Sequence, residues 1–271
     1  MFDFLFSKQS KKRKSLGLAL SGGAARGIAH LGVIKALEDN HIPISAISGV
    51  SSGSLIGGLY AAGLPLDELI KQVKEVRWYD LAGVQLSKRG MVSSRRIERF
   101  VDKLVGPVTF KELKIPFMTL ATDILAGKGV QMNDPDMKLS KAIRASASFP
   151  GVYSPVKIGD RYFIDGGATC NIPVNEVRQL GADFVISVDA VPDVTLDKLP
   201  SNLLRIADRS VDLLLHKNKT EKRPNVDLPL KPVKEAISSF DLHRGDDLVR
   251  FGEESIYPYL PMIKKKLGIK E

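Results

Sequence analysis

The chain has 271 residues, of which 44% are hydrophobic and 26% are charged, a composition typical of globular proteins. Its single cysteine, Cys170, excludes an intramolecular disulfide, and its four histidines are scattered without metal-binding spacing, so we expect no metal and no other cofactor. The single cysteine fits a reducing, cytoplasmic location. The net charge of +9 is unaccompanied by a nucleic-acid-binding motif, so we expect no nucleic-acid partner.

The first 15 residues are predicted to form a basic N-terminal tail. An aromatic run at 2–6 precedes basic residues at 8–14, and it is too short for a membrane span or a signal peptide. The tail is either solvated or in peripheral contact with an anionic membrane surface, to which both its aromatic and its basic residues are suited.

Residues 16–271 are predicted to form one α/β domain with a largely parallel sheet and helices on both faces, because apolar runs alternate with helical patterns. No internal repeat or low-complexity linker divides this region. Strands are expected at 16–20, 44–48, 117–122, 152–158, 162–164 and 184–188. Helices are expected at 24–39, 54–63, 95–104, 139–147, 173–180, 199–217 and 246–266, the last interrupted at Pro258 and Pro261.

The turn after the second expected strand has the pattern G-x-S-x-G, with Gly49, Ser51 and Gly53 in the three fixed positions. Such a turn between a strand and a helix exposes its serine hydroxyl as a nucleophile, and the small neighbours keep the turn tight. The following helix directs its positive N-terminus at the site, which favours a developing oxyanion. Ser51 is therefore a candidate nucleophile. A glycine-rich turn with a capping serine is the alternative.

The first expected helix opens with a glycine-rich turn that contains Gly22, Gly23 and Gly27. The spacing fits neither a dinucleotide fingerprint nor a phosphate-binding P-loop. An oxyanion hole made by the backbone N–H groups of Gly22, Gly23 and Ala24 is the third interpretation, because glycine permits a close approach of the backbone. Arg26 either braces this loop or meets a phosphate, and a salt bridge to a nearby carboxylate is equally open.

A base for the serine is offered by Asp165, which ends an expected strand and is followed by Gly166 and Gly167. The two glycines clear space around the carboxylate, so it could accept the serine proton directly. Its ordinary pKa of about 3.9 makes it a weak base, so geometry and exclusion of water must supply the rest. Taken alone, the Asp-Gly-Gly sequence is also compatible with a surface turn.

These three motifs, in this order, resemble the signature blocks of the patatin-like phospholipase family, and the resemblance covers residues 15–260. The stretches 144–150 and 169–173 are also similar to runs in bacterial members. One departure is Ala24, which stands where plant members have a third glycine; it keeps the N–H and points to the bacterial branch of the family.

The resemblance implies a patatin-like α/β sheet and a catalytic dyad without histidine or metal. It implies cleavage of phospholipid or lysophospholipid esters through an acyl-serine intermediate. The residue roles that it implies are Ser51 as nucleophile, Asp165 as base, Gly22, Gly23 and Ala24 as oxyanion hole, Arg26 near the substrate, and Gly27, Gly49, Gly53, Gly166 and Gly167 as motif glycines.

Two other functions remain open on the sequence. An α/β-hydrolase would combine Ser51 and Asp165 with His216 or His243 as a triad, although only two expected strands precede Ser51. A lipid- or protein-binding module that retains the fold without catalysis is the other. The sequence does not select among phospholipase, lysophospholipase and general esterase activity, and it indicates no oligomeric state.

Overall fold

The computed structural model describes residues 13–75, 92–201, 203–220 and 225–269. The aromatic and basic residues 1–12, for which membrane contact was predicted, lie outside the described residues. Within the described ranges, no helix is both long and apolar enough to cross a membrane.

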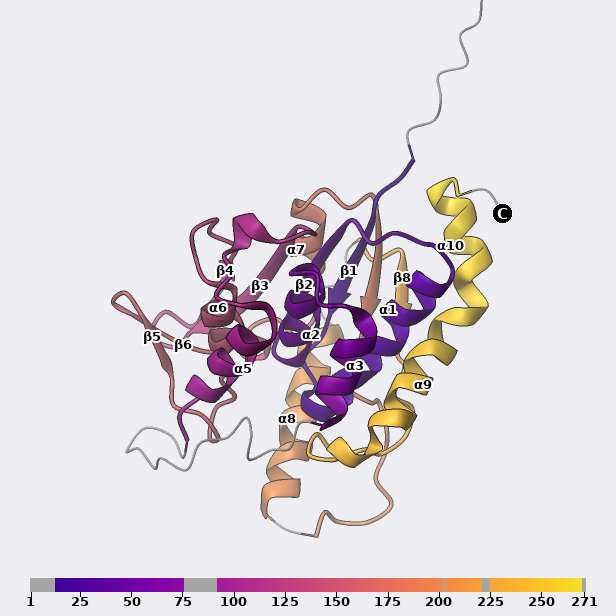
Figure 1. The fold of residues 1–271 in the computed structure, drawn as a ribbon. Coiled ribbons are helices and arrows are strands. Elements are labelled where there is room, and N and C mark those ends of the chain that lie inside the picture. The colour runs from indigo at the N-terminus through magenta and orange to yellow at the C-terminus, as the bar shows by residue number, and fades with distance from the viewer. Residues whose placement is uncertain (1–12, 76–91, 202, 221–224, 270–271) are drawn as a thin grey trace, which may run out of the picture.

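An eight-stranded sheet forms the centre of the described structure (Figure 1). Its strands are hydrogen-bonded along the path β5-β6-β3-β2-β1-β7-β8, and β4 also pairs with β3. The pairs among β3, β2, β1, β7 and β8 are parallel, whereas the pairs that involve β4, β5 and β6 are antiparallel. The strands are β1 (Leu16–Leu20), β2 (Ala46–Gly49), β3 (Phe117–Asp123), β4 (Lys128–Met132), β5 (Val156–Ile158), β6 (Arg161–Asp165), β7 (Phe184–Val188) and β8 (Leu228–Leu230).

Helices cover both faces of this sheet, as the sequence predicts for an α/β fold. The helices are α1 (Ala29–Asp39), α2 (Ser52–Ala61), α3 (Leu66–Glu75), α5 (Arg95–Val105), α6 (Leu139–Ser146), α7 (Val174–Gln179), α8 (Leu203–Thr220), α9 (Gly245–Ile256) and α10 (Leu260–Leu267). A 3-10 helix (Ala24–Ile28) precedes α1.

The two faces of the sheet differ in the size of their side chains. Along β1, Leu16, Leu18 and Leu20 are fully buried in the large core that also holds α1, α2 and α9. Ala19, on the opposite face, belongs to a small cluster with Val177 of α7. Small side chains on that face let α7 lie close to the sheet, while the leucine face is filled by several helices.

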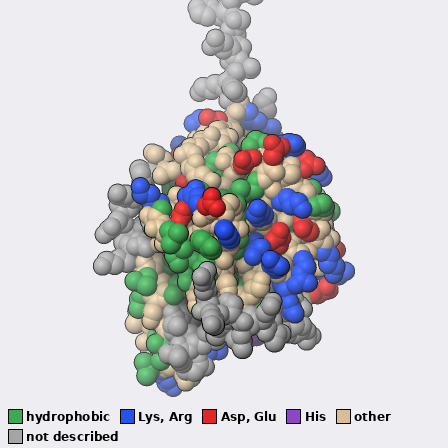
Figure 2. Space-filling model, turned by 90° about the vertical axis from the view of Figure 1, so that its left-hand side faces the viewer, with side chains coloured by type: hydrophobic (Ala, Val, Ile, Leu, Met, Phe, Trp, Pro, Cys, Tyr) green, Lys and Arg blue, Asp and Glu red, His purple; other side chains and the backbone are tan. Residues whose placement is uncertain are grey.

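The side of the molecule on which β5 and β6 end the sheet shows apolar side chains beside both basic and acidic ones (Figure 2). Lys157 lies 5.8 Å from the ring centroid of Tyr162, and Arg161 lies 5.1 Å from that of Phe163. Charges on an edge hairpin oppose the addition of another strand.

The topology of β3 brings the predicted nucleophile and base together. Thr119 of β3 pairs with Gly49 of β2 and also with β4, so β2 and β4 lie on opposite edges of β3. Ala121 pairs with Asp165 of β6 and also with β4, so β6 and β4 lie on opposite edges too. Consequently β2 and β6 share one edge of β3 and meet there end to end. Ser51, just after β2, is thereby brought close to Asp165.

Several expected boundaries need correction. The strand expected at 152–158 begins only at Val156, directly after Pro155, which lacks the N–H that a ladder requires. The strand expected at 44–48 is displaced to Ala46–Gly49. The last helix breaks at the 3-10 turn containing Pro258, whereas Pro261 lies in the first turn of α10, where proline is tolerated. Helix α3 and strands β4 and β8 were not predicted.

Candidate active site

Ser51 occupies a tight turn between β2 and α2. Its backbone has φ 54° and ψ −120°, a conformation that L residues rarely adopt and that is typical of strained nucleophile turns. The N–H of Ser51 donates to Ser146 Oγ at 3.0 Å, and the residue is only half-buried. A side chain at Gly53 would collide with the carbonyl oxygens of Leu20 and Ser21. The turn therefore packs tightly on its inner side and leaves the serine accessible.

Asp165 ends β6 with a buried carboxyl group that is 5% exposed. Oδ1 accepts a hydrogen bond from the N–H of Gly167 at 2.8 Å, whereas Oδ2 has no partner in full hydrogen-bond geometry among the described residues. Burial raises the pKa of Asp165 to about 6, while interactions with the Ser51 hydroxyl and the Gly167 N–H act in the opposite direction. The hydroxyl thus lies within reach of the carboxyl without completing a hydrogen bond, as is common in unliganded sites.

Two peptide units of the glycine-rich turn are held by neighbouring side chains. The carbonyl oxygen of Gly22 accepts from Ser21 Oγ at 2.8 Å, and that of Gly23 accepts from Arg26 Nε at 3.2 Å and from the Arg26 N–H at 3.1 Å. In a trans peptide the N–H points away from the C=O, so the N–H groups of Gly23 and Ala24 face the other way. Neither has an acceptor among the described residues, and both residues are half-buried. Both groups can therefore bind a ligand oxygen.

Gly22 has a different environment from its two neighbours. Its N–H donates to the carbonyl oxygen of Asn171 at 3.3 Å, so this predicted oxyanion donor already has an acceptor. A Cβ on Gly22 would lie 3.1 Å from Ser51 Cβ and 2.8 Å from Asn171 Oδ1. The absence of a side chain at Gly22 therefore makes room for Ser51 and for Asn171.

Asn171 is a site residue to which the sequence analysis gave no role. It is 5% exposed, and its Nδ2 has no hydrogen-bond partner among the described residues. Its Oδ1 also lies 3.2 Å from where a Cβ of Gly167 would be, so it lies against both the glycine-rich turn and the turn that follows Asp165. The signal in the sequence is an amide shortly after the Asp-Gly-Gly motif.

Helix α2 contributes a third backbone donor. The N–H of Ser52, the first residue of the helix, has no acceptor among the described residues. The residue after a nucleophilic serine commonly supplies such a donor, and the helix N-terminus adds positive potential. The sequence analysis predicted the helix but did not name this N–H.

Arg26, which the resemblance placed near the substrate, lies inside the protein. Nη1 and Nη2 donate to the two carboxylate oxygens of Asp212 in α8, each at 2.7 Å, and the two side chains are 3% and 8% exposed. The geometry favours the loop-bracing and ion-pair alternatives over contact with a substrate phosphate.

The remaining motif glycines lie where backbone or side chains approach very closely. A Cβ on Gly27 would collide with the Ser52 side chain, one on Gly49 with the backbone of Gly53, and one on Gly166 with the backbone of β3. These contacts explain why the motifs use glycine, independently of the chemistry.

No histidine among the described side chains makes a hydrogen bond with Ser51 or Asp165. His30 is fully buried in α1, where Nε2 lies 2.9 Å from the carbonyl oxygen of Ser21, and burial lowers its pKa to about 4. His243 is exposed in the turn Leu242–Arg244, and the side chain of His216 lies outside the described residues. The described residues include no group of His, Cys, Asp and Glu that could hold a metal ion.

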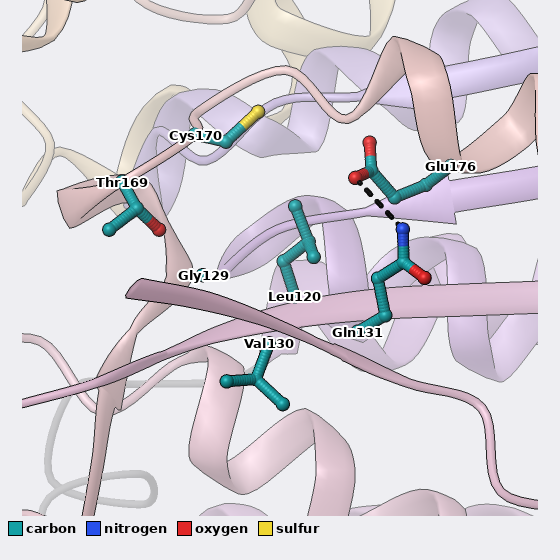
Figure 3. Close-up of a pocket in the computed structure, with 7 residues that line it drawn as sticks. All are labelled: Leu120, Gly129, Val130, Gln131, Thr169, Cys170 and Glu176. Carbon is teal, nitrogen blue, oxygen red and sulfur yellow. Dashed lines mark hydrogen bonds between the residues drawn. The ribbon is translucent and has the colours of Figure 1, made fainter. Parts of the chain in front are cut away.

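A hollow of about 530 Å³ lies beside β3 and β4 (Figure 3). Gln131 Nε2 donates to Glu176 Oε1 across it at 3.4 Å. It is lined by Leu120, Gly129, Val130, Gln131, Thr169, Cys170 and Glu176. Neither Ser51 nor Asp165 lines it, so this hollow is separate from the candidate active site.

Comparison with known proteins decides the family. The profile named patatin-like phospholipase matches residues 18–178. The chain belongs to this family. One relative is an uncharacterized NTE family protein of Mycobacterium tuberculosis. It is 36% identical over 198 residues, which cover 68% of this chain and 54% of that protein. Lysophospholipase NTE1 of Saccharomyces cerevisiae is 32% identical over 193 residues, which cover 69% of this chain and 11% of the yeast protein.

The patatin-like fold is also found in solved structures. VipD from Legionella pneumophila has a TM-score of 0.55 at 15% identity, covering 93% of this chain and 67% of VipD. The type III effector protein ExoU has a TM-score of 0.54 at 14% identity, covering 93% of this chain and 54% of ExoU. At such identities the likeness shows the fold alone. The chain spans about half the length of the first curated relatives that it matches.

Proposed function

We propose that this protein is a serine acyl-hydrolase that cleaves carboxylic esters of lipids, with Ser51 as nucleophile and Asp165 as base. The observation that carries the proposal is the meeting of β2 and β6 on one edge of β3, which brings a strained, accessible serine to a buried carboxylate with a free oxygen. The family and its lysophospholipase-named relatives support a lipid ester as substrate.

In the acylation step, Ser51 Oγ attacks the ester carbonyl carbon and its proton passes to Asp165 Oδ2. Negative charge develops on the carbonyl oxygen, which the N–H groups of Gly23 and Ala24 stabilise, at roughly 3 kcal/mol for one such donor. The tetrahedral intermediate collapses to an acyl-Ser51 ester, and Asp165 returns the proton to the departing alcohol.

In the deacylation step, water attacks the acyl-Ser51 carbonyl carbon while Asp165 accepts a proton from that water. Collapse releases the carboxylic acid and restores the Ser51 hydroxyl. A base works best when its pKa lies near the working pH, so the rise of the Asp165 pKa to about 6 makes this carboxylate a better base than an exposed one.

The test is hydrolysis of a short-chain p-nitrophenyl ester by the wild type, Ser51→Ala, Asp165→Asn and the control His243→Ala. We expect the first two variants to lose activity by at least about 1,000-fold, and His243→Ala to retain it. Fluorophosphonate labelling of the wild type but not of Ser51→Ala would identify the nucleophile.

Two outcomes would contradict the proposal. If His243→Ala is as inactive as Ser51→Ala, the base is a histidine. If the wild type neither hydrolyses any ester nor reacts with a fluorophosphonate, the protein is a binding module. Given activity, competition between phosphatidylcholine and lysophosphatidylcholine vesicles or micelles measures which lipid class is preferred.

A further inference from the structure

Helix α8 contacts both halves of the candidate active site (Figure 1, orange). Asp212 binds Arg26 of the glycine-rich turn, although the two are 186 positions apart in the sequence. One turn further, Leu215 Cδ2 lies 3.6 Å from where a Cβ of Gly167 would be, beside the base Asp165. The helix thus joins the oxyanion turn to the turn of the base.

The ion pair between Arg26 and Asp212 is buried, and each of the three guanidinium nitrogens donates a hydrogen bond. Nη1 and Nη2 bind the carboxylate, and Nε binds the carbonyl oxygen of Gly23. A buried arginine requires such a partner, because an unpaired charge in the interior is strongly unfavourable. Asp212 therefore determines where the guanidinium lies, and the guanidinium determines where the Gly23 carbonyl points.

The peptide between Gly23 and Ala24 is held in an unfavourable orientation by these contacts. Ala24 has φ 50°, in the left-handed region that residues with a Cβ disfavour. Rotating this peptide by half a turn would return φ to negative values, and it would also turn the Ala24 N–H away from its present direction. Two donors of Arg26, Nε and the backbone N–H, oppose that rotation by binding the Gly23 carbonyl oxygen.

We propose that Asp212 is a positioning residue for the reaction: through Arg26 it keeps the Gly23–Ala24 peptide turned so that the Ala24 N–H faces the substrate oxyanion. This role rests on the proposed function. Asp212 does not touch the substrate, so its contribution falls on the transition state, in which the oxyanion is formed, rather than on binding of the ester.

The first variant is Asp212→Asn, which keeps the shape of the side chain and removes its charge. We expect kcat for the p-nitrophenyl ester to fall about 100-fold, the lower end of the effect of losing one oxyanion donor, with KM changed less than about threefold. Affinity for a trifluoromethyl ketone, which mimics the oxyanion, should fall in parallel with kcat/KM. Asp212→Glu should recover part of the rate.

Asp227→Asn is the matched control. Asp227 also binds an arginine, Arg178, but among the described residues the other hydrogen-bond partners of these two side chains are Asn225, Ala182 and Val185, none of which belongs to the glycine-rich turn. We expect it to leave kcat and ketone affinity unchanged.

A second variant separates positioning from folding. The double change Arg26→Met and Asp212→Leu replaces the ion pair by apolar groups of similar size, which commonly preserves stability. A stable double variant that is still about 100-fold slower supports the proposal, and one with wild-type kcat and ketone affinity overturns it. Equal activity of the wild type and Ser51→Ala would instead overturn the proposed function, and with it this role.

Discussion

Asp165 should be a residue whose ionised form weakens the fold. Its pKa is raised from 3.8 to about 6 by burial, so the folded state binds the proton more tightly than the unfolded state does. Between these two pKa values the free energy of unfolding falls as pH rises. Above about pH 6 it has lost the full contribution of this group and changes no further on its account. A difference of about two pKa units corresponds to about 3 kcal/mol.

The substitution Asp165→Asn removes this loss of stability and can keep the hydrogen bond from the Gly167 N–H. The amide oxygen can still accept from the Gly167 N–H, and the amide N–H groups face the oxygen of the Ser51 hydroxyl. We therefore expect Asp165→Asn to be more stable than the wild type, by on the order of 3 kcal/mol at about pH 7.5. The difference should shrink as pH falls from about 6 and approach zero only below about pH 3.8, where Asp165 is neutral in both the folded and the unfolded state.

Urea unfolding followed by circular dichroism measures both free energies across this pH range. Asp123→Asn is a control with the opposite sign, because the Arg161 side chain holds the pKa of Asp123 below its usual value. Removing that charge should lower stability at neutral pH. The reasoning is refuted if Asp165→Asn is no more stable than the wild type at about pH 7.5, or if the difference does not depend on pH.

Three further outcomes are expected. In a pH–rate profile, kcat/KM should rise tenfold per pH unit below about pH 6 and level off above it, because the Asp165 base must be ionised; a flat profile from about pH 5 to 8 would contradict this role. Gly22→Ala should slow acylation at least about tenfold in stopped-flow assays, because its Cβ would press on Ser51 and Asn171; wild-type acylation would show that the turn adapts. Asn171→Ala should lower kcat but change the free energy of unfolding by less than about 1 kcal/mol, because the Asn171 Nδ2 has no hydrogen-bond partner among the described residues. An unchanged kcat would show that Asn171 has no part in catalysis.

The sequence predicted the strands and helices around the motifs because their signals are local. The apolar run Leu16–Leu20 predicts its strand from five consecutive residues, and the glycines around Ser51 predict the turn in the same local way. Strand β4 was not predicted because only two of its residues, Val130 and Met132, are apolar, which is too short an alternation to indicate a strand. Strand β8 was not predicted because it has three residues, one of them proline.

Within the candidate site, the sequence predicted residue types but not long-range partners. The partner of Arg26 stayed open because nothing local connects it to Asp212. Gly22 was grouped with Gly23 and Ala24 as a donor, although its N–H binds the carbonyl oxygen of Asn171. The basicity of Asp165 also depends on burial, which comes from tertiary packing.

The end-to-end arrangement of β2 and β6 on β3 has a consequence for folding kinetics. Ser51 and Asp165 become neighbours only after β3 has recruited two strands that are distant from each other in the chain. Contacts of this kind form slowly, because loop closure must precede them. In refolding experiments, recovery of ester hydrolysis therefore reports assembly of the sheet, whereas helical signal reports the earlier, local steps.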